Sequence, residues 1–427
     1  MTSTTVQPDP STPPLSWRSR EVQLIVLVAL GLRLLWGVLI PCIPSSDCVA
    51  YDTFAQNLVN HGTFGFHPDE PSAFWAPGTS FIIAAMYKIF GIAFFPVVVL
   101  NIILGSLSVY LTIRLADTLL SRTPALVAGA ILALWPVHIQ LTSVLSSELP
   151  FTTFLVGGTL AWVTMREKPV IRALLTGVLF AFAVYIRATA ILIPPILAGL
   201  EFLFMPRRAR TFVTALGLGL LMAAIIAPWT YRNYTLYHDL VPISANNGTN
   251  FWMGNNPGTN GNYQEPPVFP DLNQAQIDRE LMRRATDYIK QEPGAFVKRT
   301  TTKFILQHGP QTIGVVWNKD ALRPRIGEMG MKLLKGLSTA YWFAAIAGAI
   351  VGIVMLVREV GLLKTITNPI LVIWVYFALL HAIYVIQDRY IIPATPLVAC
   401  LAGVSIGVLF DRWRERRTYN RDKAIAA

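Results

Sequence analysis

The chain has 427 residues, of which 53% are apolar and 14% are charged, whereas about 25% of the residues of a typical soluble domain are charged. This composition excludes an ordinary soluble domain and indicates a membrane protein. The net charge of +11 comes from basic residues scattered between apolar runs, so it does not indicate a nucleic-acid-binding protein. Three cysteines are too few for a disulfide scaffold, although Cys42 and Cys48 lie close enough in sequence for a bridge.

The two ends of the chain differ from its apolar interior. Residues 1–16 are rich in Pro, Ser and Thr without hydrophobic periodicity, which predicts a disordered cytosolic tail. They do not resemble a signal peptide, because they lack a charged start and the next apolar run is long enough to span a membrane. Residues 412–427 are basic and predict a second cytosolic tail. We therefore expect one membrane domain over residues 17–411.

The membrane domain contains a series of apolar runs. A helix that crosses a bilayer needs about 20 mostly apolar residues. Ten runs reach or approach this length and predict an all-α integral membrane protein with about ten spans. The runs cover residues 22–41, 94–113, 125–142, 149–165, 170–186, 189–205, 211–229, 336–357, 368–386 and 391–410.

The apolar stretch at 79–91 is shorter, and whether it crosses the membrane sets the orientation of every later span. Lys and Arg concentrate in cytoplasmic loops. If 79–91 does not cross, the PRRAR turn at 206–210 and the RWRERR segment at 412–417 both face the cytosol. We therefore predict a multi-pass plasma-membrane protein with both termini in the cytoplasm, and 79–91 as a helix at the outer surface.

Two long segments, 42–93 and 230–335, then lie on the outer side. The second contains a loop at 246–262 rich in Asn and Gly, followed by an amphipathic helical pattern from about 273 to 308. Outer loops of this length are more often functional than inert. We expect this loop to cover a binding cavity.

The stretch SSDCVAYDTFAQNLVNHGTFGF at 45–66 opens the first outer segment. Ser46 and Asp47 favour a helix start and Gly62 a helix end, and the apolar residues between them recur at helical spacing. This predicts an amphipathic helix on the outer membrane surface. Asp47 at the mouth of the bundle is a candidate general base, with simple helix capping as the structural alternative. Asp52 is the second candidate and lies about 140° further round the helix.

Several stretches resemble GT-C glycosyltransferases in the same order along the chain. Asp47 with Tyr51 one turn later, followed by FWAPGTSFIIAAMYKIFG, is similar to the first outer loop of these enzymes. The later similar stretches are SSELPFTTFL, AVYIRATAILIPP, APWTYRNYTLYHDLVPISANNGTNFWMGNNP and QDRYIIPATPLVACLAG. The resemblance is to the protein O-mannosyltransferase and lipid A aminoarabinose transferase families. Asp47-Cys48 replaces the acidic pair of the mannosyltransferases, so their acceptor is not carried over.

The resemblance implies a GT-C-type helix bundle with outer juxtamembrane helices. It also implies transfer of a sugar from a polyprenyl-phosphate donor to a hydroxyl of a glycolipid, glycan or protein on the outer face. Direct displacement by a hydroxyl that Asp47 activates would invert the anomeric centre. The sequence shows no acidic cluster for a metal, so we expect no metal and no cofactor; the partners are the donor, the acceptor and membrane lipids, and not nucleic acid.

The donor phosphate would need positive charge, and the planar fork of arginine suits it. Arg389, Arg187 and Arg232 lie at outer ends of predicted spans and are the candidates, although each can instead extend to lipid headgroups. Arg389 is favoured, with a salt bridge to Asp388 as its structural alternative. Arg33, inside the first span, is expected to have a structural partner.

Other polar residues are candidates for contacts with the sugar or the acceptor. A carboxylate such as Glu148 is costly near lipid and therefore suggests function, with a favourable place at a helix N-terminus as the alternative. The further candidates combine amides and aromatic rings: Tyr51, Trp252, Asn255 and Asn256. Asn is equally common in turns, which is the structural explanation for the last two.

Two other protein classes remain open. A lipid or sugar transporter or flippase would also be polytopic, but many transporters are built from repeated halves and no repeat is visible here. An O-antigen-type ligase or polymerase would depend on basic residues in a late outer loop more than on an early aspartate. The substitution Asp47→Asn separates that class from the transferase.

Overall fold

The computed structural model describes residues 6–8 and 12–426. These residues form α-helices, short 3₁₀ helices and connecting segments, without a β-strand among them. The all-α prediction is thus confirmed. The disordered tail predicted over 1–16 falls partly on residues 1–5 and 9–11, which lie outside the described residues.

Each of the ten predicted spans coincides with one helix or with two or three consecutive helices. The elements are α1 (Arg20–Leu39), α4 (Phe94–Leu119), α5 (Arg122–Ala133) with α6 (Pro136–Gln140) and η1 (Leu141–Ser143), α7 (Glu148–Thr164), α8 (Pro169–Ile186), η2 (Ala188–Leu192) with α9 (Ile193–Phe204), α10 (Arg208–Tyr237), α15 (Lys319–Val360), α17 (Pro369–Ile383) and η3 (Asp388–Ala394) with α18 (Thr395–Ala426).

The count of ten spans is not confirmed. Within the part of the chain that the structure describes, six helices are long and apolar enough to cross a membrane. The pair formed by α5 and the segment Pro136–Ser143, bent by 49°, would be a seventh. Proline explains the break, because Pro136 lacks the backbone N–H that a continuing helix needs. α9 and α17 also have proline in their first turn and are shorter apolar helices.

The smaller helices occur in the two long polar segments. They are α2 (Asp47–His61), α3 (Gly78–Phe90), α11 (Asn247–Asn255), α12 (Gln274–Gln291), α13 (Pro293–Leu306) and α14 (Ile313–Trp317), with α16 (Leu362–Ile366) between two spans. The predicted helices at 47–61, 79–91 and 273–308 are confirmed, the last as the pair α12 and α13. α12 begins with a capping box in which Asn273 and Gln276 satisfy each other's backbone N–H groups.

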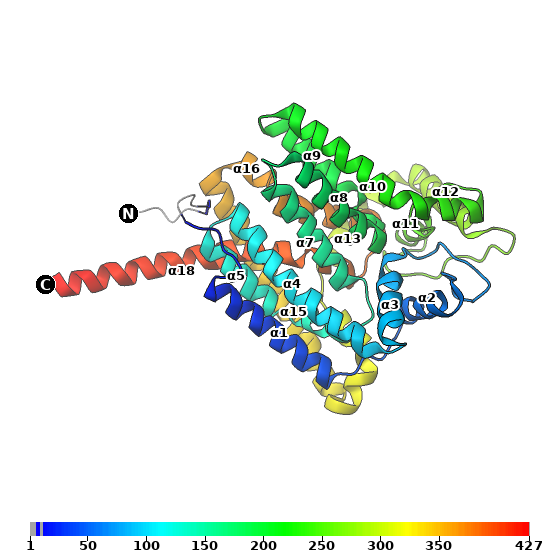
Figure 1. Ribbon diagram of the computed structural model, residues 1–427, viewed down its shortest axis with the longest axis horizontal. Helices are drawn as coiled ribbons and strands as arrows, with labels where there is room; N and C mark the ends of the chain where they lie inside the picture. The colour runs from blue at the N-terminus through cyan, green and yellow to red at the C-terminus, as the bar shows by residue number, and fades with distance from the viewer. Residues whose placement is uncertain (1–5, 9–11, 427) are drawn as a thin grey trace.

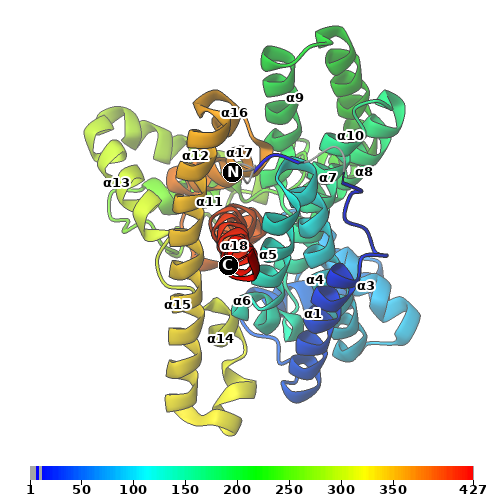
Figure 2. The ribbon, with the colours of Figure 1, turned by 90° about the vertical axis from the view of Figure 1, so that its left-hand side faces the viewer.

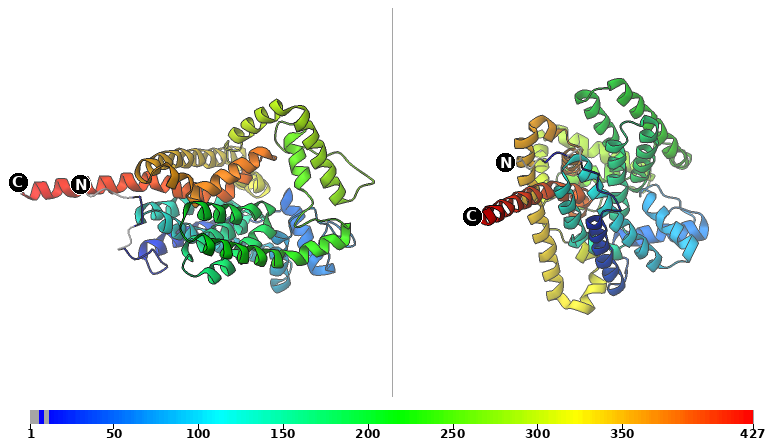
Figure 3. Two further views of the ribbon diagram at one scale, coloured as in Figure 1. Left: turned by 90° about the horizontal axis from the view of Figure 1, so that it is seen from above. Right: turned by 60° about the vertical axis from the view of Figure 1, so that its left-hand side comes forward.

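The polar segments gather at one end of the molecule. In Figure 1 the C-terminal part of α18 protrudes from one end, and α2, α3, α11 and α12 lie at the opposite end. Figure 3, seen from above, shows the yellow-green α12 and α13 at the end away from the protruding helix. Segments 42–93 and 230–335, far apart in the sequence, therefore lie together in space.

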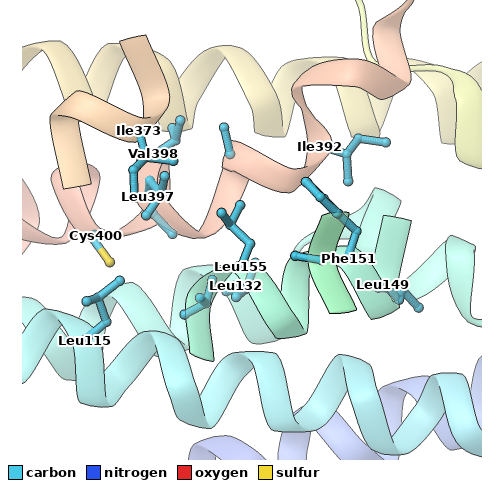
Figure 4. Packing of buried hydrophobic residues seen from close by; sticks show 14 of the residues in the cluster. Leu115, Leu132, Leu149, Phe151, Leu155, Ile373, Ile392, Leu397, Val398 and Cys400 are labelled. Atoms are coloured by element: carbon cyan, nitrogen blue, oxygen red, sulfur yellow. The ribbon is translucent and has the colours of Figure 1, made fainter. Parts of the chain in front are cut away.

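α18 is the central helix of the bundle. It packs against α5 and α15, and Figure 2, which looks along α18, shows these helices on opposite sides of it. Its buried Leu397, Val398 and Cys400 lie among side chains of neighbouring helices (Figure 4). At Gly352 of α15 a β-carbon would lie 2.0 Å from the carbonyl oxygen of Leu401, so only glycine allows this close approach.

The structure changes the limits of two predicted segments. α15 is two helices joined at a kink at Gly327, which has a φ of 60°, so helix begins well before the predicted end of the outer loop at 335. α18 continues through Ala426, so most of the predicted tail at 412–427 is helical. Leu15 is buried, and its N–H donates to the Asp117 carboxylate at 2.7 Å. The three cysteines are free, so the bridge between Cys42 and Cys48 is absent.

Candidate active site

Asp47 is the first residue of α2 and does not act as its N-cap. The cap position belongs to Ser46, whose φ of 54° is unusual for a residue with a side chain. The Ser46 side chain makes no capping hydrogen bond. α2 ends at the predicted place, where Gly62 adopts the left-handed conformation with a φ of 72°. The capping explanation for Asp47 is therefore wrong, and its carboxylate is available for another partner.

That partner is Arg389. Asp47 Oδ2 lies 2.6 Å from Arg389 Nη1, and the arginine side chain is only 8% exposed. Arg389 Nε also donates to Gln387 Oε1 at 2.6 Å, and the guanidinium lies over the Trp317 ring. The alternative pairing with Asp388 is wrong, because that carboxylate accepts hydrogen bonds from the backbone and side chain of Thr312.

A second ion pair joins Glu148 to Arg187. Glu148 is the first residue of α7, is fully buried, and places one carboxylate oxygen against Arg187 Nη2. Arg187 also donates from Nε to Ser147 Oγ at 2.8 Å. The other carboxylate oxygen, Oε2, is buried without a hydrogen-bond partner among the described residues. The helix dipole favours a carboxylate at this position, but it does not supply a hydrogen-bond donor to Oε2.

The two ion pairs belong to one site. The guanidinium groups of Arg187 and Arg389 lie 5.9 Å and 5.1 Å from the centre of the Tyr390 ring. Burial raises the pKa of Tyr51 above its usual range, Asp47 and Glu148 raise it further, and both arginines lower it. Both guanidinium groups thus lie near the same ring, that of Tyr390, and each of them has one of the two carboxylates as its partner. We call Asp47, Glu148, Arg187 and Arg389 the charged cluster; its formal charges cancel.

Asp52 lies outside the charged cluster. Its carboxylate accepts a hydrogen bond from the Tyr87 hydroxyl at 2.6 Å and another from Gln56 at 3.0 Å, and so ties α2 to α3. Burial raises the pKa of Tyr87, and the hydrogen bond to Asp52 raises it further. The two aspartates of α2 therefore have different surroundings, as their spacing on the helix predicts.

Arg232 holds a loop. It donates to the carbonyl oxygen of Ser72 at 2.7 Å and to Asn233 Oδ1 at 2.9 Å, and its guanidinium lies 4.6 Å from the Trp229 ring centre. These contacts fasten the loop before α3 to α10. None of the charged-cluster residues is among its hydrogen-bond partners within the described chain.

The amides of the 246–262 loop also have protein partners. The Asn255 side chain donates to the carbonyl oxygens of Phe251 and Ile383, at 2.9 and 2.8 Å. The Asn256 side chain donates to the Trp252 carbonyl and to Gln264. Trp252 is half-buried. These residues fix α11 against the end of α17, and their contact with a sugar stays a prediction.

Arg33 has the structural role expected from its place in the first span. It is fully buried and donates to backbone carbonyl oxygens of Ala29, Leu132 and Ala133. The latter two lie at the end of α5, where the break before Pro136 leaves carbonyls free of helix partners. Within the described residues, no group of three His, Cys, Asp or Glu side chains is arranged to hold a metal ion.

A cavity of about 750 Å³ opens between α9 and α10. Its lining is almost wholly apolar and includes Trp162, Pro194, Gly219 and Met222. None of the charged-cluster residues is part of this lining. This cavity could not be predicted from the sequence, because its walls are ordinary apolar positions of spans.

Comparison with known proteins identifies a family signature in part of the chain. Residues 69–231 match the model of the dolichyl-phosphate-mannose-protein mannosyltransferase family. This segment includes Glu148 and Arg187 but neither Asp47 nor Arg389. No curated protein matches the chain.

Solved structures of two other proteins share the helical architecture of this chain. One is the oligosaccharyltransferase AglB from Archaeoglobus fulgidus, in complex with an inhibitory peptide and a dolichol-phosphate; its TM-score is 0.56 at 13% identity, covering 95% of this chain and 52% of AglB. Another is ArnT from Cupriavidus metallidurans bound to undecaprenyl phosphate, with a TM-score of 0.56 at 14% identity, covering 90% of this chain and 59% of ArnT. This chain thus spans little more than half the length of either protein. It has the fold of the GT-C glycosyltransferases, and the resemblance seen in its sequence is confirmed.

Proposed function

We propose that the chain is a membrane glycosyltransferase. It moves a sugar from a polyprenyl-phosphate-linked donor to a hydroxyl of a glycolipid, glycan or protein on the outer face of the plasma membrane. The observation that carries the proposal is the contact of Asp47 with Arg389 beside the pair of Glu148 and Arg187. A base and two phosphate-binding cations are the groups that this reaction needs.

The residues divide the chemistry between them. The acceptor oxygen bonds to the anomeric carbon while the bond from that carbon to the phosphate oxygen breaks. Asp47 takes the acceptor's proton, and the polyprenyl phosphate leaves with its negative charge held by Arg389 and Arg187. Because the acceptor attacks opposite the departing phosphate, the anomeric configuration inverts.

The neutral charge balance of the cluster implies an order of events. In the resting site Arg389 holds Asp47, so the guanidinium occupies the carboxylate oxygen that would accept the proton of an acceptor hydroxyl. The donor phosphate competes for the same guanidinium. Its arrival therefore frees Asp47, so the base becomes active only when the donor is in place.

Glu148 supplies the remaining polar contact. Its free Oε2 is a buried acceptor without a partner among the described residues, and an unsatisfied buried acceptor costs about 1–3 kcal/mol. A hydroxyl of the sugar or of the acceptor satisfies it. Glu148 thus orients a substrate, while its pairing with Arg187 keeps that arginine in place.

Three further observations support a lipid-linked donor. The cavity between α9 and α10 has the apolar character that an isoprenoid chain requires. AglB and ArnT, which share the fold, have been solved with dolichol-phosphate and undecaprenyl phosphate. The signature at 69–231 belongs to a family named for a dolichyl-phosphate sugar donor.

The test uses the purified full-length chain in proteoliposomes with a pool of polyprenyl-phosphate sugars and candidate acceptors. Mass spectrometry should detect free polyprenyl phosphate together with an equal amount of glycosylated acceptor, and Arg389→Gln should lose both products. Arg207→Gln, which removes an exposed ion pair with Glu167, is the matched control and should behave as wild type. Movement of intact donor across the bilayer without cleavage would instead identify a flippase.

A further inference from the structure

Lys303 on α13 is buried although nothing in the proposed reaction uses it. It is 1% exposed, and its ammonium donates to the carbonyl oxygens of Gly254, Ile383 and Tyr384 at 2.9, 3.0 and 2.8 Å. It also lies 3.4 Å from Asn255 Oδ1. One side chain thus joins α13 to the C-terminal ends of α11 and α17.

The residues that Lys303 holds lead directly to the charged cluster. Residues 383–388 connect α17 to η3, and we call them the strap. Lys303 fixes the start of the strap, and Gly261 fixes its middle by accepting a hydrogen bond from the Ile386 N–H at 2.8 Å. At its end Gln387 accepts from Arg389 Nε at 2.6 Å. The position of Arg389 therefore depends on where the strap lies.

The aliphatic part of Lys303 also shapes this contact. Gly261 has a φ of +92°, and a β-carbon there would lie 2.7 Å from Lys303 Cγ. The 246–262 loop can approach the strap because residue 261 is glycine, which leaves room for the aliphatic stem of Lys303 beside it. Lys303 therefore acts both as a hydrogen-bond donor and as a spacer between α13 and the strap.

A lysine is a costly choice for this position. All of its hydrogen-bond partners within the described chain are neutral oxygens, so the buried charge is not offset by a carboxylate. Burial, together with the smaller effect of the nearby charge of Arg299, lowers the pKa of Lys303 to about 7. A methionine of similar size would fill the same space without a charge, but it cannot hold three carbonyl oxygens from two helix ends.

We propose that Lys303 is a positioning residue for the donor phosphate, which sets the strap so that the Arg389 guanidinium meets that phosphate. The proposal rests on the phosphate-binding role of Arg389 in the proposed function. It assigns to the outer helix α13 a part in the site, although α13 contributes no side chain to the charged cluster.

The experiment measures the affinity of the full-length chain in nanodiscs for undecaprenyl phosphate. Lys303→Met should weaken binding on the order of 10-fold, within the range of coupling between residues of one network. In an Arg389→Gln background the same change should have no further effect, because the strap then positions nothing. Lys298→Met, an exposed lysine on the same helix, should bind as wild type.

A second variant covers the case in which Lys303→Met does not fold. Lys303→Gln keeps two N–H donors and removes the charge, so it should bind with intermediate affinity and show the same dependence on Arg389. Thermal unfolding of each variant, followed alongside binding, shows how much of the protein is folded, and affinities are referred to the folded fraction.

The outcomes separate this inference from the proposed function. Equal losses of affinity in the wild-type and Arg389→Gln backgrounds would give Lys303 a general structural role and overturn the inference. Unchanged affinity in Lys303→Met would overturn it as well, and in both cases the loss caused by Arg389→Gln leaves the proposed function standing. If Arg389→Gln binds as tightly as wild type, both the phosphate role of Arg389 and the inference fail.

Discussion

Asp47 and Arg389 come from opposite ends of the chain, and Asp47 Oδ2 lies 2.6 Å from Arg389 Nη1. The two residues that the sequence marks as base and as phosphate ligand therefore hold each other in the resting site. Under the proposed function this site would exchange one anion for another: the donor phosphate would replace a carboxylate, and the released carboxylate would be the group that the reaction needs next.

The buried pair of Glu148 and Arg187 should respond strongly to loss of one partner. Arg187→Met leaves the Glu148 carboxylate buried and unpaired, which should destabilise the protein by about 3–5 kcal/mol. The double variant Glu148→Gln/Arg187→Met should recover much of that loss, because no unpaired charge remains. Thermal unfolding in detergent measures both effects.

The exposed pair of Arg207 and Glu167 provides the control for that comparison. Both side chains are more than half exposed, and surface ion pairs contribute about 0–1 kcal/mol. The free energy of unfolding of Arg207→Met should therefore differ from that of wild type by no more than this amount. Equal effects of Arg187→Met and Arg207→Met would show that the Glu148 pair is not buried as described.

Lys303 should make the stability of the protein depend on pH. The unfolded chain keeps the Lys303 proton up to a pKa near 10.5, whereas burial lowers the pKa in the folded protein to about 7. Between these values the unfolded chain binds more protons, so the free energy of unfolding should rise with pH from about 7 to about 10.5. The measurement is the difference in thermal unfolding between wild type and Lys303→Met across this interval.

Subtracting Lys303→Met removes the contribution of every other titrating group that the two proteins share. The wild type should gain stability relative to the variant as the pH rises. A difference that is constant across the interval, or that falls with pH, would mean that Lys303 keeps its proton in the folded protein.

The apolar cavity between α9 and α10 should contribute more to the binding of donors with a long lipid chain than to the binding of donors with a short one. Gly219 lines the cavity and has open space around it, so Gly219→Phe should fill part of the volume without a clash. We expect weaker binding of undecaprenyl phosphate and unchanged binding of a short-chain polyprenyl phosphate. Gly199→Phe is the control, because Gly199 on α9 also has open space but does not line the cavity. Equal binding of the long lipid by both variants would exclude the cavity as its site.

Much of the fold follows from local sequence. Apolar length and composition predict each helix of the bundle, and the helix from Asp47 to His61 is predicted from Ser46 before it, Gly62 after it and the helical spacing of its apolar residues. The number of spans does not follow, because prolines such as Pro136 break apolar runs into shorter helices. The central place of α18 is also hidden, since it depends on contacts between helices distant in sequence.

The site was only partly predictable, for the same reason. Asp47, Glu148, Arg187 and Arg389 could be chosen one by one from their places at the ends of apolar runs, but their pairing is a property of the folded chain. Arg232 occupies a similar place in the sequence, yet its hydrogen bonds go to backbone carbonyl oxygens and to the side chain of Asn233.

Lys303 gives no signal in the sequence. It is one of several basic residues in the amphipathic pattern at 273–308, and only its burial distinguishes it from exposed neighbours such as Lys298. A buried lysine on a helix that is otherwise largely exposed can be found only after the helix has been packed.

The exchange between Asp47 and the donor phosphate is tested most directly by the variant Asp47→Asn, in which sugar transfer and lipid-phosphate binding are measured on the same preparation. Transfer from the polyprenyl-phosphate sugar should fall by about 10²-fold or more, because the general base is lost. The affinity for undecaprenyl phosphate should rise, because the amide no longer competes for Arg389. Asp52→Asn, the control on the same helix, should change neither property. If Asp47→Asn transfers sugar as the wild type does, or binds the phosphate more weakly, the exchange between Asp47 and the donor phosphate does not occur.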